Sequence, residues 1–480
     1  MDTTYANAMD ESELLDDLED RTSDIQLPPA MSFLLLAIWL VICGVGFAVM
    51  LLARNIVAGA AIIAVPTFLG MILKPTFALC MLMLALPTGA GVGYGEVFSL
   101  DRGVGMSLAA SFFLNVLLTR PGLRVRHRAL WVATALTVWM GLGSLVQPYL
   151  TMELIRIFTH VQLLVLIFIV YWILETNYED TFRWALRSYV IGMVGSIFLA
   201  VRSGAAMRAT EETRDVRYSA TLGHSIDANM LSALIALAFI CAIYLFARDR
   251  SLFWRAFYFV AILFLPLMMI RTGSRGGLVA LAFTMLSPLL FVRQVLRRPT
   301  LAALLLLAIL IASISAGALI RSRGLATAVS ERLTNVGRAE QAIEFRMTAV
   351  KYALHAVANW PAGTGYWSWF ERTGSEIWPH NDFFFSLGVY GIPAGILFAV
   401  FVILLMLTVR RTPLTLEKLY ARAVLTFLLV MGLNIKQVSA KYYWVFLGFV
   451  LAAERLGWWH AEPAAEPIEE LDDEAPDTGD

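Results

Sequence analysis

Charge is scarce in this sequence. Only 15% of the 480 residues are charged, whereas 59% are hydrophobic. Soluble domains carry about 25% charged residues, so the composition excludes a soluble globular protein and predicts a polytopic membrane protein. Cysteine is scarcer still. Cys43, Cys80 and Cys241 all fall inside apolar runs, which indicates small core residues rather than a disulfide framework or a metal site.

Positive charge is nearly absent from the two ends of the chain. Residues 1–27 hold nine acids and one base, and residues 461–480 hold nine acids and no base. An acidic start predicts that there is no cleavable signal peptide, because such a leader begins with a basic segment. We expect two disordered, solvated cytoplasmic tails, 1–28 and 459–480. The body between them, 29–458, has 36 bases against 19 acids, which suits anionic lipids or a phosphorylated substrate.

Fourteen apolar runs divide the body. A membrane helix needs about 20 residues, with a range near 17–25, and several of the runs are shorter. The sequence therefore predicts an all-α polytopic membrane protein with 12–14 transmembrane helices. The runs lie at residues 31–52, 56–73, 76–92, 103–119, 129–146, 156–174, 187–201, 227–247, 256–270, 276–292, 300–319, 383–409, 423–434 and 440–457.

The orientation of the chain follows from its short basic loops. With 14 spans, four of these loops fall on one side of the membrane, and that side is predicted to be the cytoplasm. The loop near 202–226, the turn at 271–277 and the long segment 320–381 then face outward. In a Gram-negative cell this is the periplasm, and the protein is expected in the inner membrane. The loop bases are Arg120, Arg124, Arg126, Arg128, Arg248, Arg250, Arg255, Arg293, Arg297, Arg298, Arg410, Arg411, Lys418 and Arg422.

Two arginines, Arg271 and Arg275, stand between two apolar runs in the stretch 271–277. An arginine at the centre of a membrane helix costs about 2.5–3.5 kcal/mol on the mildest scale, so both are expected at the water boundary. The glycines at 273, 276 and 277 let a ligand approach the backbone. Arg275 is predicted to open the next helix, whose N-terminus favours an anion. The stretch predicts a phosphate or diphosphate cradle; the alternative is a tight turn with arginines as interfacial anchors.

The long outer segment contains a predicted amphipathic helix. Ile343, Met347, Val350, Leu354 and Val357 recur at helical spacing, and the helix should end near residues 359–361. A glycine turn and an aromatic cluster follow at 363–370. Such rings could stack on sugars, although they more often mark a membrane interface.

One histidine stands at the outer mouth of a predicted span. His380 precedes the apolar run that begins at Phe383, and Asn381 or Asp382 is suited to cap that helix and so to orient the imidazole. A lone histidine is usually structural. A neutral histidine at this place is nevertheless suited to accept a proton near neutral pH.

Four motifs in this order resemble those of the O-antigen ligase and polymerase superfamily, over about residues 210–395. They are Arg217 with Asp227-Ala228-Asn229, Ser274-Arg275-Gly276-Gly277, Arg346 with Gly363-Thr364-Gly365, and His380-Asn381 with Gly388-Val389-Tyr390-Gly391. No single motif is specific, but their order, spacing and shared sidedness together are. Ala228 departs from the pattern, since many relatives have proline there.

The resemblance implies a membrane glycosyltransferase that uses no cofactor. The donor would be a glycan on undecaprenyl diphosphate, and the acceptor a sugar hydroxyl on another glycan or on lipid A-core. Arg271, Arg275, Arg217 and Arg346 would neutralise the leaving diphosphate, and His380 would take the acceptor proton. Ser274, Gly276, Asn381 and Asp382 would support them. The predicted outer loops contain no Asp-x-Asp pair for a divalent ion, which agrees with a metal-independent, inverting reaction.

Several readings stay open at this point. Polymerase and ligase share a donor and differ only in their acceptor, and we favour a surface-polysaccharide polymerase as a prior. A lipid-linked glycan flippase or another transporter predicts paired charges deep in the spans and helices broken at the midplane. A non-catalytic assembly protein is a further alternative. The expected partners are the lipid-linked donor, the acceptor, membrane lipids and other polysaccharide-assembly proteins, with no nucleic acid.

Overall fold

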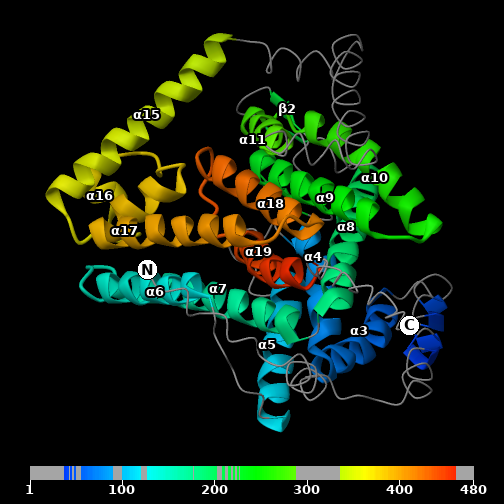
Figure 1. Ribbon diagram of the computed structural model, residues 1–480. Helices are drawn as coiled ribbons and strands as arrows, with labels where there is room; N and C mark the ends of the chain where they lie inside the picture. The colour runs from blue at the N-terminus through cyan, green and yellow to red at the C-terminus, as the bar shows by residue number, and fades with distance from the viewer. Residues whose placement is uncertain are drawn as a thin grey trace, which may run out of the picture.

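The computed structural model describes residues 56–89, 100–119, 127–176, 178–202, 227–287 and 336–460, short strands between 208 and 225, and scattered residues in 37–49. These parts form a helical assembly (Figure 1). The helices are α3 (Ile56–Leu73), α4 (Pro75–Gly89), α5 (Leu100–Thr119), α6 (Arg128–Leu145), α7 (Leu150–Thr176), α8 (Tyr178–Arg202), α9 (Ala228–Arg248), α10 (Leu252–Arg271), α11 (Arg275–Leu286), α15 (Val336–Asn359), α16 (Trp369–Thr373), α17 (Asp382–Arg411), α18 (Leu416–Gly432) and α19 (Lys441–Trp459).

The helices coincide with the predicted apolar runs. Twelve of the 14 runs correspond to a helix in the described parts of the chain, and the run 300–319 and most of 31–52 lie outside those parts. Within the described residues, six helices are long and apolar enough to cross a membrane, namely α6, α7, α8, α9, α10 and α17. The chain is therefore an α-helical polytopic membrane protein. The predicted tail 1–28 and the residues beyond His460 lie outside the described residues.

The outer loop between α8 and α9 contains strands that the sequence did not predict. β1 (Arg208–Thr210) pairs antiparallel with β2 (Asp215–Arg217), and β3 (Ala220–Thr221) pairs antiparallel with β4 (His224–Ser225). The strands have only two or three residues each, too few for a period-2 pattern to be visible in the sequence. The prediction of an all-α fold holds for the helical body and needs this correction in the loop.

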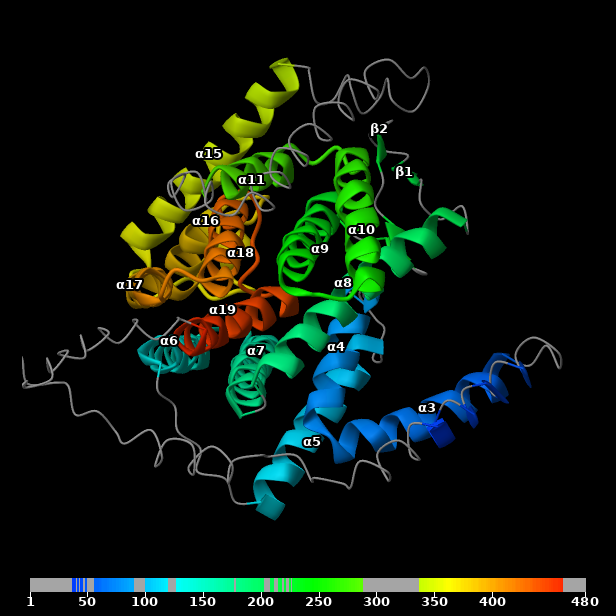
Figure 2. The same cartoon turned by 45° about the vertical axis from the view of Figure 1, so that its right-hand side comes forward.

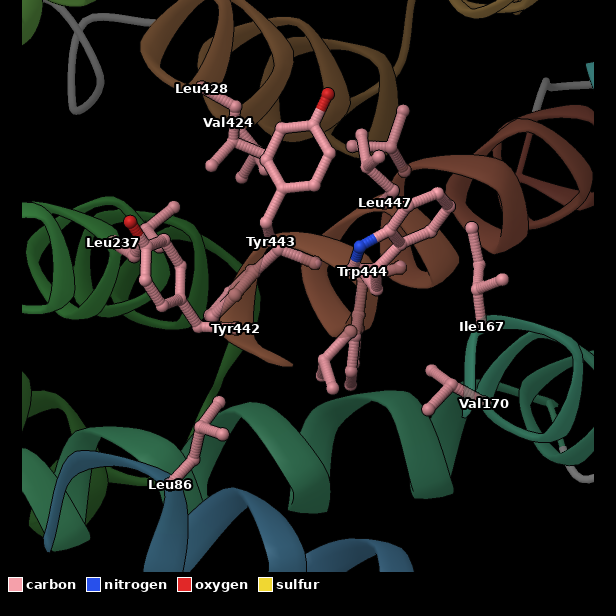
Figure 3. Close-up of a cluster of buried hydrophobic side chains, with 14 of the residues drawn as sticks. Leu86, Ile167, Val170, Leu237, Val424, Leu428, Tyr442, Tyr443, Trp444 and Leu447 are labelled. Carbon is pink, nitrogen blue, oxygen red and sulfur yellow. The ribbon is translucent and has the colours of Figure 1, made fainter. Parts of the chain in front are cut away.

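Helix α19 lies at the centre of the core. Figure 3 shows its residues Tyr442, Tyr443, Trp444 and Leu447 surrounded by apolar side chains from neighbouring helices. Val424 and Leu428 come from α18, Ile167 and Val170 from α7, Leu237 from α9 and Leu86 from α4. Figure 2 shows the same arrangement from another side, with α18 and α7 on opposite sides of α19. The large aromatic residues of α19 are thus buried by helices from distant parts of the sequence. Because α19 is held in this way, the segments that adjoin its two ends are held in place as well.

Ionic contacts gather at one end of the bundle. His460, which follows α19, lies 3.0 Å from Glu179 at the start of α8, and Glu179 lies 3.0 Å from Arg248 at the end of α9. His127, before α6, lies 3.4 Å from Glu454. The described parts of three of the four predicted basic loops, at 127–128, 248–255 and 410–422, therefore lie at this end, and the loop at 293–298 is outside the described residues. The opposite end of the bundle contains the first residues of α7, α9, α11, α17 and α19 and the last residues of α10 and α18.

The amphipathic helix is present as α15, but its larger apolar side chains point away from the protein. Ile343, Met347 and Leu354 are exposed, whereas the buried face consists of small residues, Ala349, Ala353 and Ala356. A Cβ atom added at Gly388 of α17 would lie 3.2 Å from Ala353 Cβ. Small side chains on both helices allow this close approach, as is common in membrane proteins.

Candidate functional site

The turn before α11 is built as the sequence predicted, but its glycines serve a different purpose. Ser274 caps α11, since its hydroxyl accepts a hydrogen bond from Gly277 N at 3.2 Å, and Arg275 is the first helical residue. A Cβ at Gly277 would lie 1.8 Å from Ser232 Oγ on α9, and one at Gly276 would lie 3.0 Å from Asn434 Cγ. These two glycines therefore admit neighbouring protein groups, where the sequence had suggested a ligand.

The start of α9 lies beside this turn. Asp227 caps α9, because its Oδ1 accepts hydrogen bonds from Asn229 N at 2.8 Å and Met230 N at 3.2 Å. The Ser274 hydroxyl donates to Asn229 Oδ1 at 2.8 Å. Ala228, where the sequence departs from the motif, leaves the cap intact. Asn229 of the motif Asp227-Ala228-Asn229 therefore holds the motif Ser274–Gly277 in position.

His380 lies just before α17, where Asn381 fixes the chain direction. Asn381 Oδ1 accepts hydrogen bonds from Phe383 N at 2.9 Å and Phe384 N at 3.2 Å, so Asn381 is the N-cap that the sequence predicted. His380 is exposed, and the Phe345 ring of α15 stacks against it with the ring centroids 6.0 Å apart. Desolvation by these neighbours, together with the positive charges of Lys436 and Arg346, lowers the pKa of His380 below 6.5, while Asp227 acts in the opposite direction.

Asp382 does not cap α17. It is buried, and its Oδ1 accepts hydrogen bonds from Gln437 N at 2.6 Å and Val438 N at 2.9 Å. These bonds fasten the connection between α18 and α19 to the first residue of α17, two positions after His380. Asn434 and Lys436 belong to this connection and thereby reach the site. Desolvation by burial and the charge of Arg156 lower the pKa of Lys436 to about 7, although Asp382 opposes this shift.

Arg346 joins the site through the same connection. Its Nη1 donates to Asn434 Oδ1 at 2.9 Å, and Asn434 is the residue against which Gly276 packs. Asn434 thus links the segments of Arg346 and Ser274–Gly277, and Asp382 fastens the same connection to the segment of His380. A guanidinium among such polar groups would attract an anion.

The other two predicted arginines are not joined to this group by a described contact. Arg271 is exposed at the end of α10. Arg217 lies in β2, opposite Arg208, and its side chain is outside what the structure describes. The site therefore consists of His380, Arg346, Lys436 and Asn434, with Arg275 opening α11 beside Gly276.

A backbone junction holds the glycine turn against α17. Gly365 N donates to Val389 O at 3.0 Å, and Ile392 N donates to Pro361 O at 2.9 Å. The junction requires a break in α17 at Gly391, which has φ 86° and ψ 179°. A Cβ at Gly391 would lie 2.4 Å from Ala362 C, and one at Gly363 would lie 2.6 Å from Val389 O. The glycine turn at Gly363–Gly365 and the segment Gly388–Gly391 of α17 thus form the two sides of one packing contact.

The aromatic cluster after this junction is largely internal. Tyr366 and Trp369 are buried, and Trp378 stacks on Tyr366 with the ring centroids 4.2 Å apart. The buried rings Tyr366 and Trp369 therefore contact protein, and neither a sugar nor the membrane interface, the two alternatives left open by the sequence, can reach them. Trp367 and Phe370 are the exposed members.

Sequence reasoning missed Lys436 and Asn434. Both lie in a short connection between two apolar runs, where no motif marked them. One signal was available: the chain has only five lysines among 37 basic residues, and Lys436 lies on the predicted outer side, where short loops are poor in positive charge.

No group of three or more His, Cys, Asp or Glu side chains suited to a metal ion occurs in the described parts of the chain. Comparison with protein-family models and with curated proteins gives no match. The resemblance to the O-antigen ligase and polymerase superfamily therefore rests on the four motifs and on their arrangement.

Proposed function

We propose that this chain is a membrane glycosyltransferase that moves a glycan from undecaprenyl diphosphate to a sugar hydroxyl, as a surface-polysaccharide polymerase or an O-antigen ligase. One observation carries the proposal: the exposed imidazole of His380 stacks on Phe345, the neighbour of Arg346, and lies two residues before Asp382, which holds the connection that contains Lys436. A proton acceptor beside cations is what transfer from a diphosphate leaving group requires.

The reaction would proceed by direct displacement. The acceptor hydroxyl attacks the anomeric carbon, and the bond from that carbon to the diphosphate oxygen breaks with its electron pair. Undecaprenyl diphosphate leaves with an added negative charge, which Arg346 and Arg275 stabilise. His380 Nδ1 or Nε2 receives the hydroxyl proton. Attack opposite the leaving group inverts the anomeric centre, and the arginines take the place of a metal ion.

The proposal includes a topology. We place 12–14 spans in a bacterial inner membrane, with both termini in the cytoplasm and the His380 site at the periplasmic face. The ionic end formed by Glu179, Arg248 and His460 would then be cytoplasmic. This orientation agrees with the basic loops at that end.

The break in α17 is the feature that a transporter would share. In transporters, a broken helix offers free backbone groups to a substrate near the midplane. Here the backbone groups beside Gly391 are hydrogen-bonded to the turn at 361–365. Protein therefore fills the break, and this favours a transferase whose chemistry lies outside it.

The first test is a purified transfer assay. Protein in lipid nanodiscs would receive an undecaprenyl-diphosphate glycan, with or without lipid A-core, and with a chelator present. We expect glycan transfer that persists in chelator, and the product identifies polymerase or ligase. Arg275→Lys is expected to lose most of the activity, because lysine lacks the bidentate fork of arginine. No transfer to any acceptor would refute the proposal, and near-normal activity of Arg275→Lys would favour an anchor role for Arg275.

The second test is the pH profile. His380 acts as a base only when neutral, and its pKa lies below 6.5, so the rate should be constant above about pH 6.5 and fall on acidification. Asp227→Asn retains a capping side chain but removes the charge that raises the pKa of His380. The acidic limb of kcat/KM should therefore move to lower pH in this variant. A limb above pH 6.5, or one that moves upward in Asp227→Asn, would exclude His380 as the base.

A further inference from the structure

Two cations outside the proposed arginine set share the ring of Tyr366. Arg156, in the second turn of α7, has its Cζ 3.9 Å from the ring centroid, and Lys436 Nζ is 5.0 Å from the same centroid. Lys436 Nζ also lies 4.4 Å from the Phe385 ring centroid and 5.1 Å from that of Trp378. We call Arg156, Lys436 and these three rings the Tyr366 box.

Neither cation of the box has a hydrogen-bond partner within the described residues. Arg156 Nε is buried and unpartnered, and Lys436 Nζ makes only ring contacts. Their neighbour Arg346, in contrast, donates to Asn434 Oδ1. A buried donor without a partner costs about 1–3 kcal/mol, and more when it is charged. Arg156 Nε is such a donor, and Lys436 Nζ at the same ring adds a second N–H group that has no acceptor among the described residues. Together they indicate a place for an anionic ligand.

The nearby carboxylates are occupied elsewhere. Glu153 Oε1 accepts a hydrogen bond from Trp367 N at 2.8 Å, and Ser144 donates to Glu153 Oε2 at 3.4 Å. Asp382 Oδ1 accepts from two backbone N–H groups of the α18–α19 connection. Both acids therefore hold loops in place. Glu153 interacts electrostatically with Arg156 and Asp382 with Lys436, but neither acid is hydrogen-bonded to these cations, whose N–H groups are left available to a ligand.

We propose that the Tyr366 box is a second anion subsite, which binds the carboxylate of an acidic sugar residue in the glycan. The inference rests on the proposed transferase function and adds a substrate class to it. Arg156 and Lys436 would share the carboxylate, and the apolar face of the sugar ring would pack on exposed Trp367 at the edge of the box. Because Gln437, next to Lys436, is hydrogen-bonded to Asp382 two residues after His380, the subsite would lie close to the acceptor hydroxyl.

A carboxylate on a sugar suits this site better than a second phosphate. Arginine binds a carboxylate in a bidentate manner, and the walls of the box are aromatic on several sides. Exposed Trp367 at the edge of the box offers a ring face to the C–H groups of a pyranose, whereas a diphosphate would meet that ring with fully hydrated oxygens. The proposed diphosphate cradle, by contrast, is lined by polar groups such as Asn434 and Ser274.

The test uses one oligosaccharide in two forms. The first contains a glucuronic acid residue, and the second is its carboxyl-reduced counterpart, which carries glucose at that position. Binding of each to the full-length protein in nanodiscs is measured by calorimetry. We expect the acidic form to bind about tenfold or more tightly. Lys436→Gln and Arg156→Gln should each lose this preference. Lys351→Gln, an exposed position on α15, removes the same charge and should retain it.

Each outcome decides the inference. Equal binding of the two forms by the wild type, or a preference that survives in both glutamine variants, overturns it. Lys436→Arg keeps the charge and should keep the preference, which separates loss of the cation from loss of the fold. Inorganic pyrophosphate should bind Arg156→Gln as tightly as it binds the wild type, because Arg156 lies outside the His380 site. If Arg156→Gln weakens pyrophosphate binding instead, this cation belongs to the diphosphate cradle, and the second subsite is refuted while the transferase proposal stands. A saccharide preference without any transfer activity would refute the transferase proposal alone.

Discussion

His380→Ala is expected to lower glycan transfer by about 10²–10⁴-fold, the usual contribution of a general base. The imidazole is exposed beside cations that keep it neutral at pH 7, so its removal takes away the proton acceptor and little packing. Donor binding depends on the arginines and should stay close to that of the wild type. The measurement is single-turnover transfer from an undecaprenyl-diphosphate glycan, with donor affinity determined separately.

The control is His355→Ala in the same outer segment. His355 is exposed on α15, where its contacts are to Asn359 and Trp360, and we expect wild-type transfer from this variant. If His380→Ala made normal amounts of product, His380 would be excluded from proton transfer. Equal losses in both variants would instead indicate a general effect on the outer segment.

Gly391→Ala is expected to destabilise the protein by about 3 kcal/mol or more. Gly391 has a positive φ with ψ near 180°, a region that is essentially restricted to glycine. In addition, the new Cβ would lie 2.4 Å from Ala362 C and 2.5 Å from Pro361 O. These are backbone atoms of the junction, so the contact cannot be relieved by rotating a side chain. The apparent melting temperature in detergent and the fraction of monodisperse protein report the effect.

Gly374→Ala is the control that distinguishes backbone strain at a positive φ from steric collision of the new Cβ. Gly374 also has a positive φ, 65°, at the end of α16, but a Cβ there would meet nothing within 4 Å. It should therefore cost only about 1–2 kcal/mol, the conformational penalty of an L-residue in this region. If Gly391→Ala were no more destabilising than Gly374→Ala, the junction between the glycine turn and α17 would contribute little to stability.

The helices were predictable because long apolar runs have few alternatives in a membrane. The caps were predictable for a related reason: Ser274 and Asn381 each stand directly before an apolar run and bond the first free N–H groups. The face that α15 buries was not predictable. Hydrophobicity does not distinguish lipid from protein, and close packing between membrane helices favours small residues. Alanines 349, 353 and 356 therefore face inward while Ile343 and Met347 face outward.

The site was predictable only in part. His380 and Arg346 were identified, because each belongs to a motif at the edge of a span. Lys436 and Asn434 were not, because their positions depend on Asp382, a contact across more than 50 residues. Gly276 and Gly277 were identified as important for the wrong reason. A glycine pattern reports that something comes close to the backbone, and the sequence does not say whether the neighbour is a ligand or, as here, Asn434 and Ser232.

The clasp that Asp382 makes with Gln437 and Val438 has a consequence for chimeric proteins. Segments around 380 and 436 would have to be exchanged together as one cassette, because grafting either alone leaves a buried carboxylate facing a foreign partner. Acceptor preference engineered by loop swapping should therefore transfer only in double grafts, with each single graft giving poorly folded protein.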